Sequence, residues 1–215
     1  MSSSTRLLKY AVPLVSTLGF TREALARSVL SLPSSETAKG HSEPLSDSAV
    51  TALFGPEDEA RRLLVNAWLQ EGLEHMRRTA RITSTSRDLL VARLQYNEPI
   101  LSQLPQAFAL LGAHGMHIYD PLPALKHVAQ IADHAYLLTQ DQSLQLEWYA
   151  RRGSLAAAYA AAELHQIASP HSAVAFLDSL LGSTAYLKST LNEIGQYSNY
   201  VFKSWKGIIK SSGIL

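Results

Sequence analysis

The sequence has 215 residues, of which 47% are hydrophobic, a formal net charge of +1 and no cysteine. The lack of cysteine excludes disulfides, thiolate nucleophiles and zinc–thiolate sites, and the near-zero charge excludes binding of polyanions through overall charge. No apolar run approaches the roughly 18–20 residues that span a bilayer. Leu and Ala supply 62 residues but Val and Ile only 18, which favours helices because Leu and Ala lose little side-chain freedom there.

Residues 1–56 are predicted to form a head of three helices. Apolar residues recur at helical spacing in three segments. The predicted helices cover residues 5–18, 22–31 and 46–54. Gly19 is suited to end the first, and Thr21 and Ser46 are suited to cap the next two. The polar segment 33–45, PSSETAKGHSEPL, predicts an exposed loop insertion.

This head has the plan of a helix-turn-helix. The spacing of GF, T-x-x-A-L-A and S-D-S-A-V-T-A-L-F-G resembles the head of the TetR family. The third helix, 46–54, contains Asp47 and no basic residue, whereas a recognition helix needs Arg, Lys, Asn or Gln near bases and phosphates. We therefore expect no nucleic-acid partner. The alternative is a TetR-like DNA-binding regulator that has lost or altered its DNA contacts.

Residues 57–182 are predicted to form an all-α core that follows the head. Helical spacing and breakers at Pro99, Pro105 and Pro170 divide this region, with a loop at 112–121. The stretch SLAAAYAAAE has small residues on most faces and is typical of a helix in the middle of a bundle. The predicted helices cover residues 57–83, a helix from Ser86, a segment around 100–111, and residues 122–138, 143–168 and 171–182.

The sequence offers no catalytic residue and no metal site. His114 and His117 form an HGMH pair without a third ligand nearby, and two histidines do not make a zinc site. Glu71, Glu74 and Glu163 lack the His three residues on that a di-iron bundle requires. No phosphate-binding loop, dinucleotide fingerprint or G-x-S-x-G occurs. We predict a non-enzymatic protein; the alternative is an enzyme with an unseen motif.

The C-terminal segment 183–215 is predicted to form an amphipathic helix that lies on a membrane. Four lysines and one glutamate give residues 188–210 a net charge of +3. The alternative is a helix that docks on its own bundle or on a dimer partner. The predicted membrane-binding residues are Leu187, Leu191, Ile194, Val201, Phe202, Lys203, Trp205, Lys206, Ile208, Ile209 and Lys210.

A second notable pattern is Trp148-Tyr149 followed by two arginines, Arg151 and Arg152. Aromatic and Arg side chains are preferred in binding hot spots. The alternative is that Trp148 is buried in the core and the arginines are solvated or paired with acids.

These residues carry a resemblance that extends over nearly the whole chain. The stretches DQSLQLEWYARRGSLAAAYAAAEL (141–164), ARLQYNEPILSQLPQAFALL (92–111) and DHAYLL (133–138) resemble a family of lipid-binding coenzyme Q (ubiquinone) biosynthesis proteins. That family has a TetR-like fold and assists demethoxyubiquinone hydroxylase.

The resemblance implies a non-enzymatic protein that forms a homodimer on the matrix face of the mitochondrial inner membrane. It implies no cofactor, but a bound phospholipid or isoprenoid quinone intermediate. It also implies binding to the hydroxylase and the coenzyme Q biosynthesis complex. Carried onto this chain, the partner-binding residues are Ala135, Tyr136, Trp148, Tyr149 and Arg152.

A polyprenyl quinone needs an apolar cavity outside the bilayer, because exposing its tail to water is unfavourable by about 0.8 kcal/mol per CH₂. The predicted lipid-binding residues that line this cavity are Trp68, Leu94, Phe108, Leu111, Leu155 and Tyr159. The alternative is that these six residues are ordinary, well-packed core residues.

Overall fold

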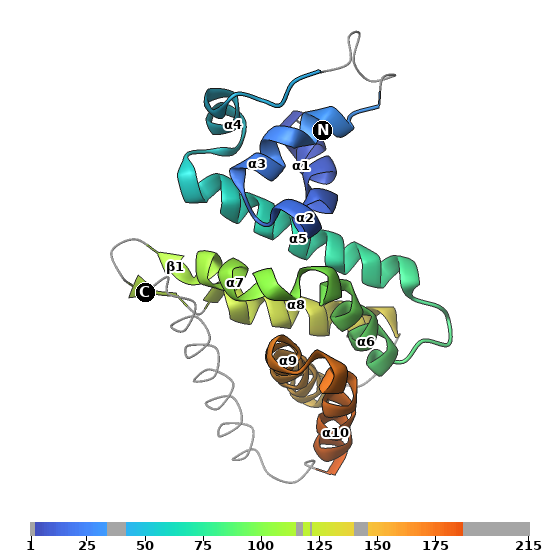
Figure 1. The fold of residues 1–215 in the computed structure, drawn as a ribbon. Helices are drawn as coiled ribbons and strands as arrows, with labels where there is room; N and C mark the ends of the chain where they lie inside the picture. The colour runs from blue at the N-terminus through green and yellow to red at the C-terminus, as the bar shows by residue number, and fades with distance from the viewer. Residues whose placement is uncertain (1–2, 34–41, 115–117, 121, 140–145, 187–215) are drawn as a thin grey trace. The chain divides into compact units, whose positions relative to one another are not determined.

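The computed structural model describes residues 3–33, 42–114, 118–120, 122–139 and 146–186. The described residues are almost entirely helical (Figure 1), as the Leu- and Ala-rich composition predicts. They belong to two compact units, Met1–Glu71 and Gly72–Leu215. The long helix α5 (Glu57–Thr79) contributes residues to both units.

The first unit contains short helices followed by the beginning of α5. Its elements are α1 (Ser3–Ala11), the 3-10 turn η1 (Val12–Leu14), α2 (Val15–Leu18), α3 (Arg22–Arg27), the 3-10 turn η2 (Ser28–Ser31) and α4 (Asp47–Phe54). The single helix predicted over 5–18 is interrupted by η1. Pro13 lies in that turn, and proline disfavours a continuous α-helix because it lacks an N–H and crowds the preceding turn.

The predicted caps of this unit are confirmed. The side chains of Thr21 and Ser46 accept hydrogen bonds from Ala24 N and Ala49 N, each at 3.3 Å. Gly19 and Gly55 end α2 and α4 with φ of 71° and 95°, a backbone conformation that glycine adopts without strain.

The core of the first unit is apolar. The rings of Phe20 and Trp68 pack edge to face with centroids 6.0 Å apart, and both side chains are buried. Arg22 joins α3 to α4, because its guanidinium donates to Asp47 Oδ1 at 2.7 Å and to Thr51 Oγ1 at 2.8 Å. Residues 34–41 of the predicted insertion lie outside the described residues.

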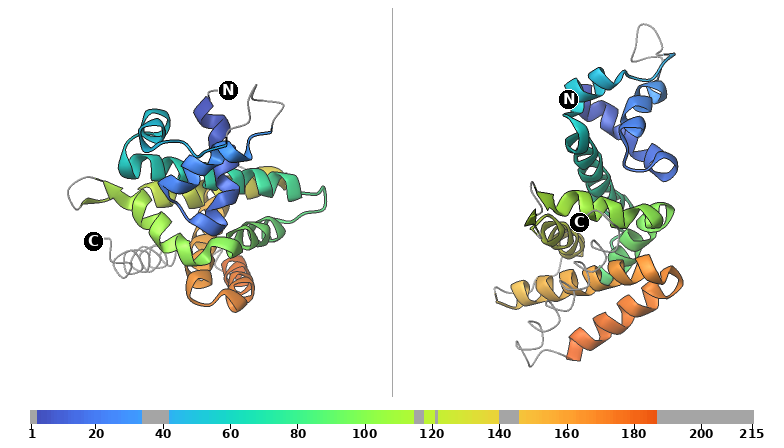
Figure 2. Two further views of the ribbon diagram at one scale, coloured as in Figure 1. Left: turned by 45° about the horizontal axis from the view of Figure 1, so that its top comes forward. Right: turned by 60° about the vertical axis from the view of Figure 1, so that its left-hand side comes forward.

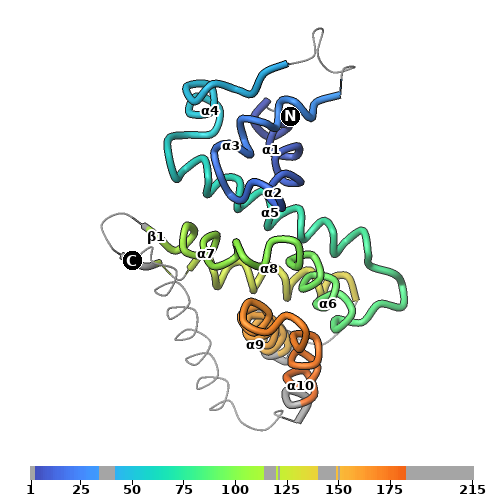
Figure 3. Tube along the Cα trace, in the orientation of Figure 1, coloured from blue at the N-terminus to red at the C-terminus, as the bar shows by residue number. Residues whose placement is uncertain are grey.

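The second unit begins with the last turns of α5. Its further elements are α6 (Ser86–Asn97), the 3-10 segment η3 (Glu98–Gln103), α7 (Leu104–Gly112), β1 (Ala113–His114), β2 (Ile118–Tyr119), α8 (Leu122–Leu138), α9 (Leu146–Ala168), the 3-10 turn η4 (Pro170–Ser172) and α10 (Ala173–Tyr186). The path of the chain through these elements can be followed in the tube drawing (Figure 3).

Three boundaries differ from the predictions. The helix predicted over 57–83 ends at Thr79, and Thr85 begins a reciprocal capping box with Asp88 at the start of α6. The predicted loop 112–121 contains the short antiparallel pair β1–β2, in which Ala113 lies opposite Tyr119. The predicted boundary between 182 and 183 falls inside α10.

Helix α9 packs against both α8 and α10 (Figures 1 and 2). Small side chains permit this close packing, since Ala158, Ala160, Ala161 and Ala162 are all buried. The central position predicted for the SLAAAYAAAE stretch is therefore confirmed, and this arrangement positions the side chains discussed next.

Candidate functional site

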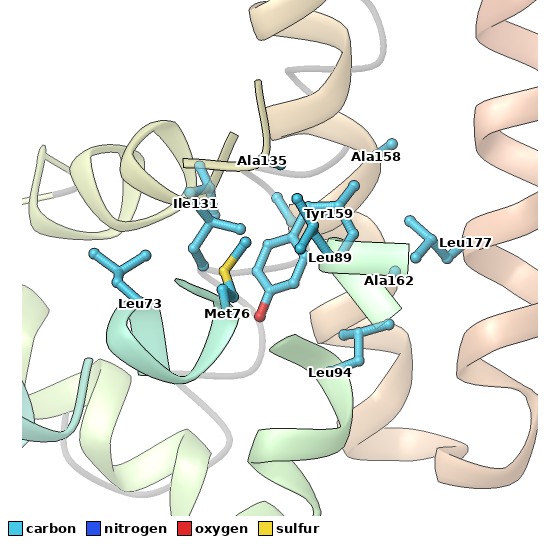
Figure 4. Packing of buried hydrophobic residues seen from close by; sticks show 13 residues of the cluster. Leu73, Met76, Leu89, Leu94, Ile131, Ala135, Ala158, Tyr159, Ala162 and Leu177 are labelled. Carbon is cyan, nitrogen blue, oxygen red and sulfur yellow. The ribbon is translucent and has the colours of Figure 1, made fainter. Parts of the chain in front are cut away.

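The second unit contains an apolar cluster that joins the end of α5 to α6, α8, α9 and α10. Tyr159 of α9 lies among these side chains, between Met76 and Leu89 in the view of Figure 4, and is fully buried. The cluster consists of Leu73, Met76, Leu89, Leu90, Leu94, Val128, Ile131, Ala135, Ala158, Tyr159, Ala160, Ala162 and Leu177.

The structure brings some of the predicted lipid-binding residues together. Leu94 and Tyr159 belong to this cluster, and the partly buried Leu155 packs against it. Phe108 and Leu111 of α7 are buried in the same unit. Trp68 is different, because it packs on Phe20 in the core of the first unit.

A group of polar side chains is buried beside the apolar cluster, and we call it the polar cluster. Three of its members come from α9, two from α6 and one from α8. The polar cluster comprises Arg93, Asn97, His127, Tyr159, Glu163 and Gln166, none of which is more than 3% exposed.

Glu163 is the centre of the polar cluster. Its Oε1 accepts hydrogen bonds from Tyr159 Oη at 2.8 Å and from Asn97 Nδ2 at 2.9 Å. His127 Nε2 lies 3.3 Å from the same oxygen. Asn97 Oδ1 in turn accepts a hydrogen bond from the Arg93 guanidinium, and Gln166 Nε2 donates to Leu94 O at 2.8 Å. Tyr159, Asn97 and His127 thus contact the carboxylate directly, and Arg93 is linked to it through Asn97.

These contacts hold Glu163 in its charged form. Burial raises the pKa of Glu163, but the attraction of His127 and Arg93 and the hydrogen bonds from His127 and Tyr159 outweigh it and lower the pKa to about 2. Burial also raises the pKa of Tyr159 well above its usual value, so this phenol stays neutral and donates its proton.

Two neighbours shape the space around the polar cluster. Gly72 faces the Arg93 guanidinium so closely that a Cβ at this position would lie 2.9 Å from Arg93 Cζ. The ring of His127 lies near two aromatic rings, with centroids 6.1 Å from Phe108 and 6.3 Å from Tyr159.

Sequence reasoning did not identify the polar cluster. Asn97 follows Arg93 by one helical turn, and Glu163 follows Tyr159 in the same way, so each pair shares a helix face with buried apolar residues. A polar residue repeated at that spacing within an apolar face was the available signal.

A second candidate region lies on the surface that α8 and α9 share. Asp133 of α8 and Arg152 of α9 form an ion pair. Leu137 lies one turn beyond Asp133 and is 70% exposed, and Tyr149 lies one turn before Arg152 and is 69% exposed. Leu137 is in the last turn of α8 and Tyr149 is in the first turn of α9, so both exposed side chains lie at the ends of α8 and α9 that follow one another in the chain.

The prediction that Ala135 and Tyr136 lie on an exposed partner surface disagrees with the structure. Ala135 is 0% exposed and Tyr136 is 6% exposed. Both share the inward face of α8 with Val128 and Ile131, and Ala135 belongs to the apolar cluster. The outward position near this end of α8 is Leu137.

The comparisons with known proteins include these helices. A sequence model of the COQ9 family matches residues 122–190. The chain is 25% identical over 216 residues to the mitochondrial ubiquinone biosynthesis protein coq9 of Schizosaccharomyces pombe, covering 97% of this chain and 80% of that protein. It is 28% identical over 173 residues to mitochondrial ubiquinone biosynthesis protein COQ9 of Bos taurus, covering 74% of this chain and 49% of that protein.

These similarities support a COQ9-type ubiquinone biosynthesis protein. The resemblance to coenzyme Q biosynthesis proteins is thereby confirmed, whereas the TetR-like fold and the assistance of the hydroxylase stay predictions.

The stretch that matches the COQ9 family contains α8, α9 and α10. It therefore includes the α8–α9 surface and four members of the polar cluster, whereas Arg93 and Asn97 precede it on α6.

The remaining predictions fall outside the described residues: the side chain of Trp148 and all the membrane-binding residues within 187–210. Among the described helices, none is long and apolar enough to cross a membrane.

Proposed function

We propose that this COQ9-type chain is a non-enzymatic, lipid-binding accessory protein of ubiquinone biosynthesis in mitochondria. It takes up a phospholipid or an isoprenoid quinone intermediate at the matrix face of the inner membrane. It then presents the substrate to demethoxyubiquinone hydroxylase. The observation that carries this proposal is the α8–α9 surface, with its exposed Leu137 and Tyr149 beside an ion pair in the family-matched stretch.

The α8–α9 surface has the composition of a protein-binding site. Exposed large apolar side chains next to a charged pair are typical of interface cores with a polar rim. Arg152 is 24% exposed and already held by Asp133, so binding a partner would restrict this side chain little further.

Lipid binding is supported by the apolar interior of the second unit. The apolar cluster draws on the end of α5 and four further helices, and it includes Leu94 and Tyr159 of the predicted set. Such an interior can receive an isoprenoid tail if its side chains move apart, since each CH₂ kept from water contributes about 0.8 kcal/mol.

Membrane docking rests on the amphipathic pattern of residues 187–210 and on its excess of lysine. Trp205→Asp in the full chain should abolish sedimentation with cardiolipin-containing vesicles while the helical content is unchanged. Undiminished binding would remove this part of the proposal.

The hydroxylase contact is tested with two matched substitutions on one helix. Leu137→Asp places a charge on the proposed surface, whereas Leu125→Asp makes the same change at a 54% exposed position nearer the start of α8. We expect Leu137→Asp to weaken binding to the hydroxylase at least tenfold and Leu125→Asp to leave it unchanged, as measured by calorimetry. Equal effects of the two variants would exclude the α8–α9 surface as the binding site.

Lipid content is tested by native mass spectrometry of the purified chain, with extraction of any bound lipid. A stoichiometric phospholipid or polyprenyl quinone supports the carrier function, and an empty chain after incubation with quinone-loaded vesicles contradicts it. Turnover of a quinone intermediate by the isolated chain would instead establish an enzyme. The same spectra give the mass of the expected homodimer.

A further inference from the structure

One oxygen of the polar cluster has no protein partner in the described structure. Glu163 is 0% exposed, and its Oε2 has no hydrogen-bond partner among the residues that the structure describes. Its Oε1, by contrast, accepts from both Tyr159 and Asn97. Buried polar atoms are nearly always hydrogen-bonded, so an orphaned carboxylate oxygen calls for a partner that the described residues do not supply.

The charge of Glu163 limits which group can do so. An ionised carboxylate only accepts hydrogen bonds, so the missing group must donate one. A phosphate would bring a second negative charge next to Glu163 and is disfavoured by repulsion. An oxidised quinone offers no donor, whereas its reduced hydroquinone form carries hydroxyl groups. A neutral hydroxyl group meets both requirements.

The surroundings favour a hydroxyl group carried by an aromatic ring. Tyr159 and Phe108 flank the His127 ring, and Tyr159 also belongs to the apolar cluster. Aromatic side chains stack on or pack edge to face against a ligand ring. An apolar interior next to them suits a hydrocarbon tail.

We propose that Glu163 Oε2 is the acceptor for a phenolic hydroxyl of an aromatic isoprenoid lipid, so that the second unit selects phenol or hydroquinone head groups over those without a free hydroxyl. This inference rests on the proposed lipid-binding function and names the chemical class of the ligand.

The test uses two ligands that differ only in the donor. The purified full chain is incubated with phosphatidylcholine vesicles that contain equal amounts of a polyprenyl phenol and its methyl ether, and the bound lipids are counted by native mass spectrometry. We expect the phenol to be preferred at least tenfold, since hydrogen bonds to charged groups are the stronger ones. A ratio measured on one sample does not depend on how much of the protein is folded.

Two variants locate the selectivity. Glu163→Gln should reduce the preference to near unity, because the neutral amide is a weaker acceptor than the carboxylate. Glu98→Gln, the same change at an exposed position of the same unit, should retain the preference.

The possible results separate this inference from the proposed function. If the unsubstituted chain binds both lipids equally, a buried water satisfies Oε2 and the phenol site is overturned while lipid binding stands. If Glu163→Gln retains the full preference, selectivity arises elsewhere and the inference is again wrong. If neither lipid binds, the proposed lipid-binding function fails, and this inference fails with it.

Discussion

The cores of the two units differ in how they treat polar groups. Among its described residues, the first unit buries a single polar side chain, Ser28, whose hydroxyl donates to Leu25 O at 2.7 Å in the preceding helix α3. The second unit buries two oppositely charged residues, Arg93 and Glu163, together with four further polar side chains from three helices.

This difference teaches what each core requires. Packing of rings and aliphatic side chains is sufficient to stabilise the first unit. In the second unit the buried charges lose their hydration, and their mutual attraction offsets that loss only when the geometry is complete. Proteins in which apolar residues replace a buried ion pair are often as stable as the original protein. We therefore infer that the polar cluster is retained for specificity or binding.

The largest effect should come from removing one buried charge. Glu163→Leu removes the buried carboxylate that attracts His127 and Arg93, and should lower the free energy of unfolding by about 3–5 kcal/mol. Ser28→Ala in the first unit should lower it by about 1 kcal/mol. Urea denaturation of both variants measures the contrast, and similar losses would show that the two cores respond alike. The double variant Arg93→Met/Glu163→Leu should recover part of the loss.

Acid should affect the second unit through the same residue. The folded pKa of Glu163, about 2, lies below the ordinary value of 4.5, so its stabilising contribution is complete above pH 4.5 and is lost as the pH falls toward 2. The shift corresponds to about 3 kcal/mol. The difference in unfolding free energy between the unsubstituted chain and Glu163→Gln should therefore shrink between pH 5 and pH 3. A pH-independent difference would contradict the assignment.

A smaller effect is expected at Gly72. Its missing side chain leaves room for the Arg93 guanidinium, and the Cβ of Gly72→Ala would lie 2.9 Å from Arg93 Cζ. Overpacking next to a buried, hydrogen-bonded guanidinium should lower the unfolding free energy by about 1–3 kcal/mol. Gly153→Ala provides the control, since a Cβ at that helical position meets nothing within 4 Å. Thermal melts should therefore separate the two variants.

The smallest effect is expected from an ion pair at the surface. Arg87 and Asp178 join α6 to α10 with an N–O distance of 2.5 Å, and hydrogen bonding between them raises the pKa of Arg87 and lowers that of Asp178. Asp178→Asn should change stability less than any variant above, because exposed pairs are screened by water and salt. A loss as large as that of Glu163→Leu would remove the distinction between exposed and buried charge.

The sequence predicted the helices best where apolar spacing and end signals agreed. Residues 122–138 were predicted as one helix and α8 has these bounds, and the caps at Thr21 and Ser46 lie where expected. Interruptions of a helix were harder to predict from apolar spacing. At Pro13 the helical spacing of apolar residues continues through a 3-10 turn that separates two helices.

The site was harder to predict, because side-chain roles depend on which face of a helix is covered. The motif DHAYLL placed the predicted partner residues near the end of α8, but a shift of one or two positions separates the buried Ala135 and Tyr136 from the exposed Leu137. The polar cluster depends on contacts between residues more than 30 positions apart, such as Asn97 with Glu163, and no local pattern encodes such a meeting.

The close approach of Gly72 to Arg93 means that substitutions at these two positions should be correlated in evolution. A side chain at position 72 is compatible with this core only if position 93 carries something shorter or differently placed. Across diverging relatives the two positions should therefore change together, with glycine accompanying arginine. Where position 93 carries a shorter residue, position 72 should be free to vary. An alignment of relatives would then reveal this contact as covariation of the two positions.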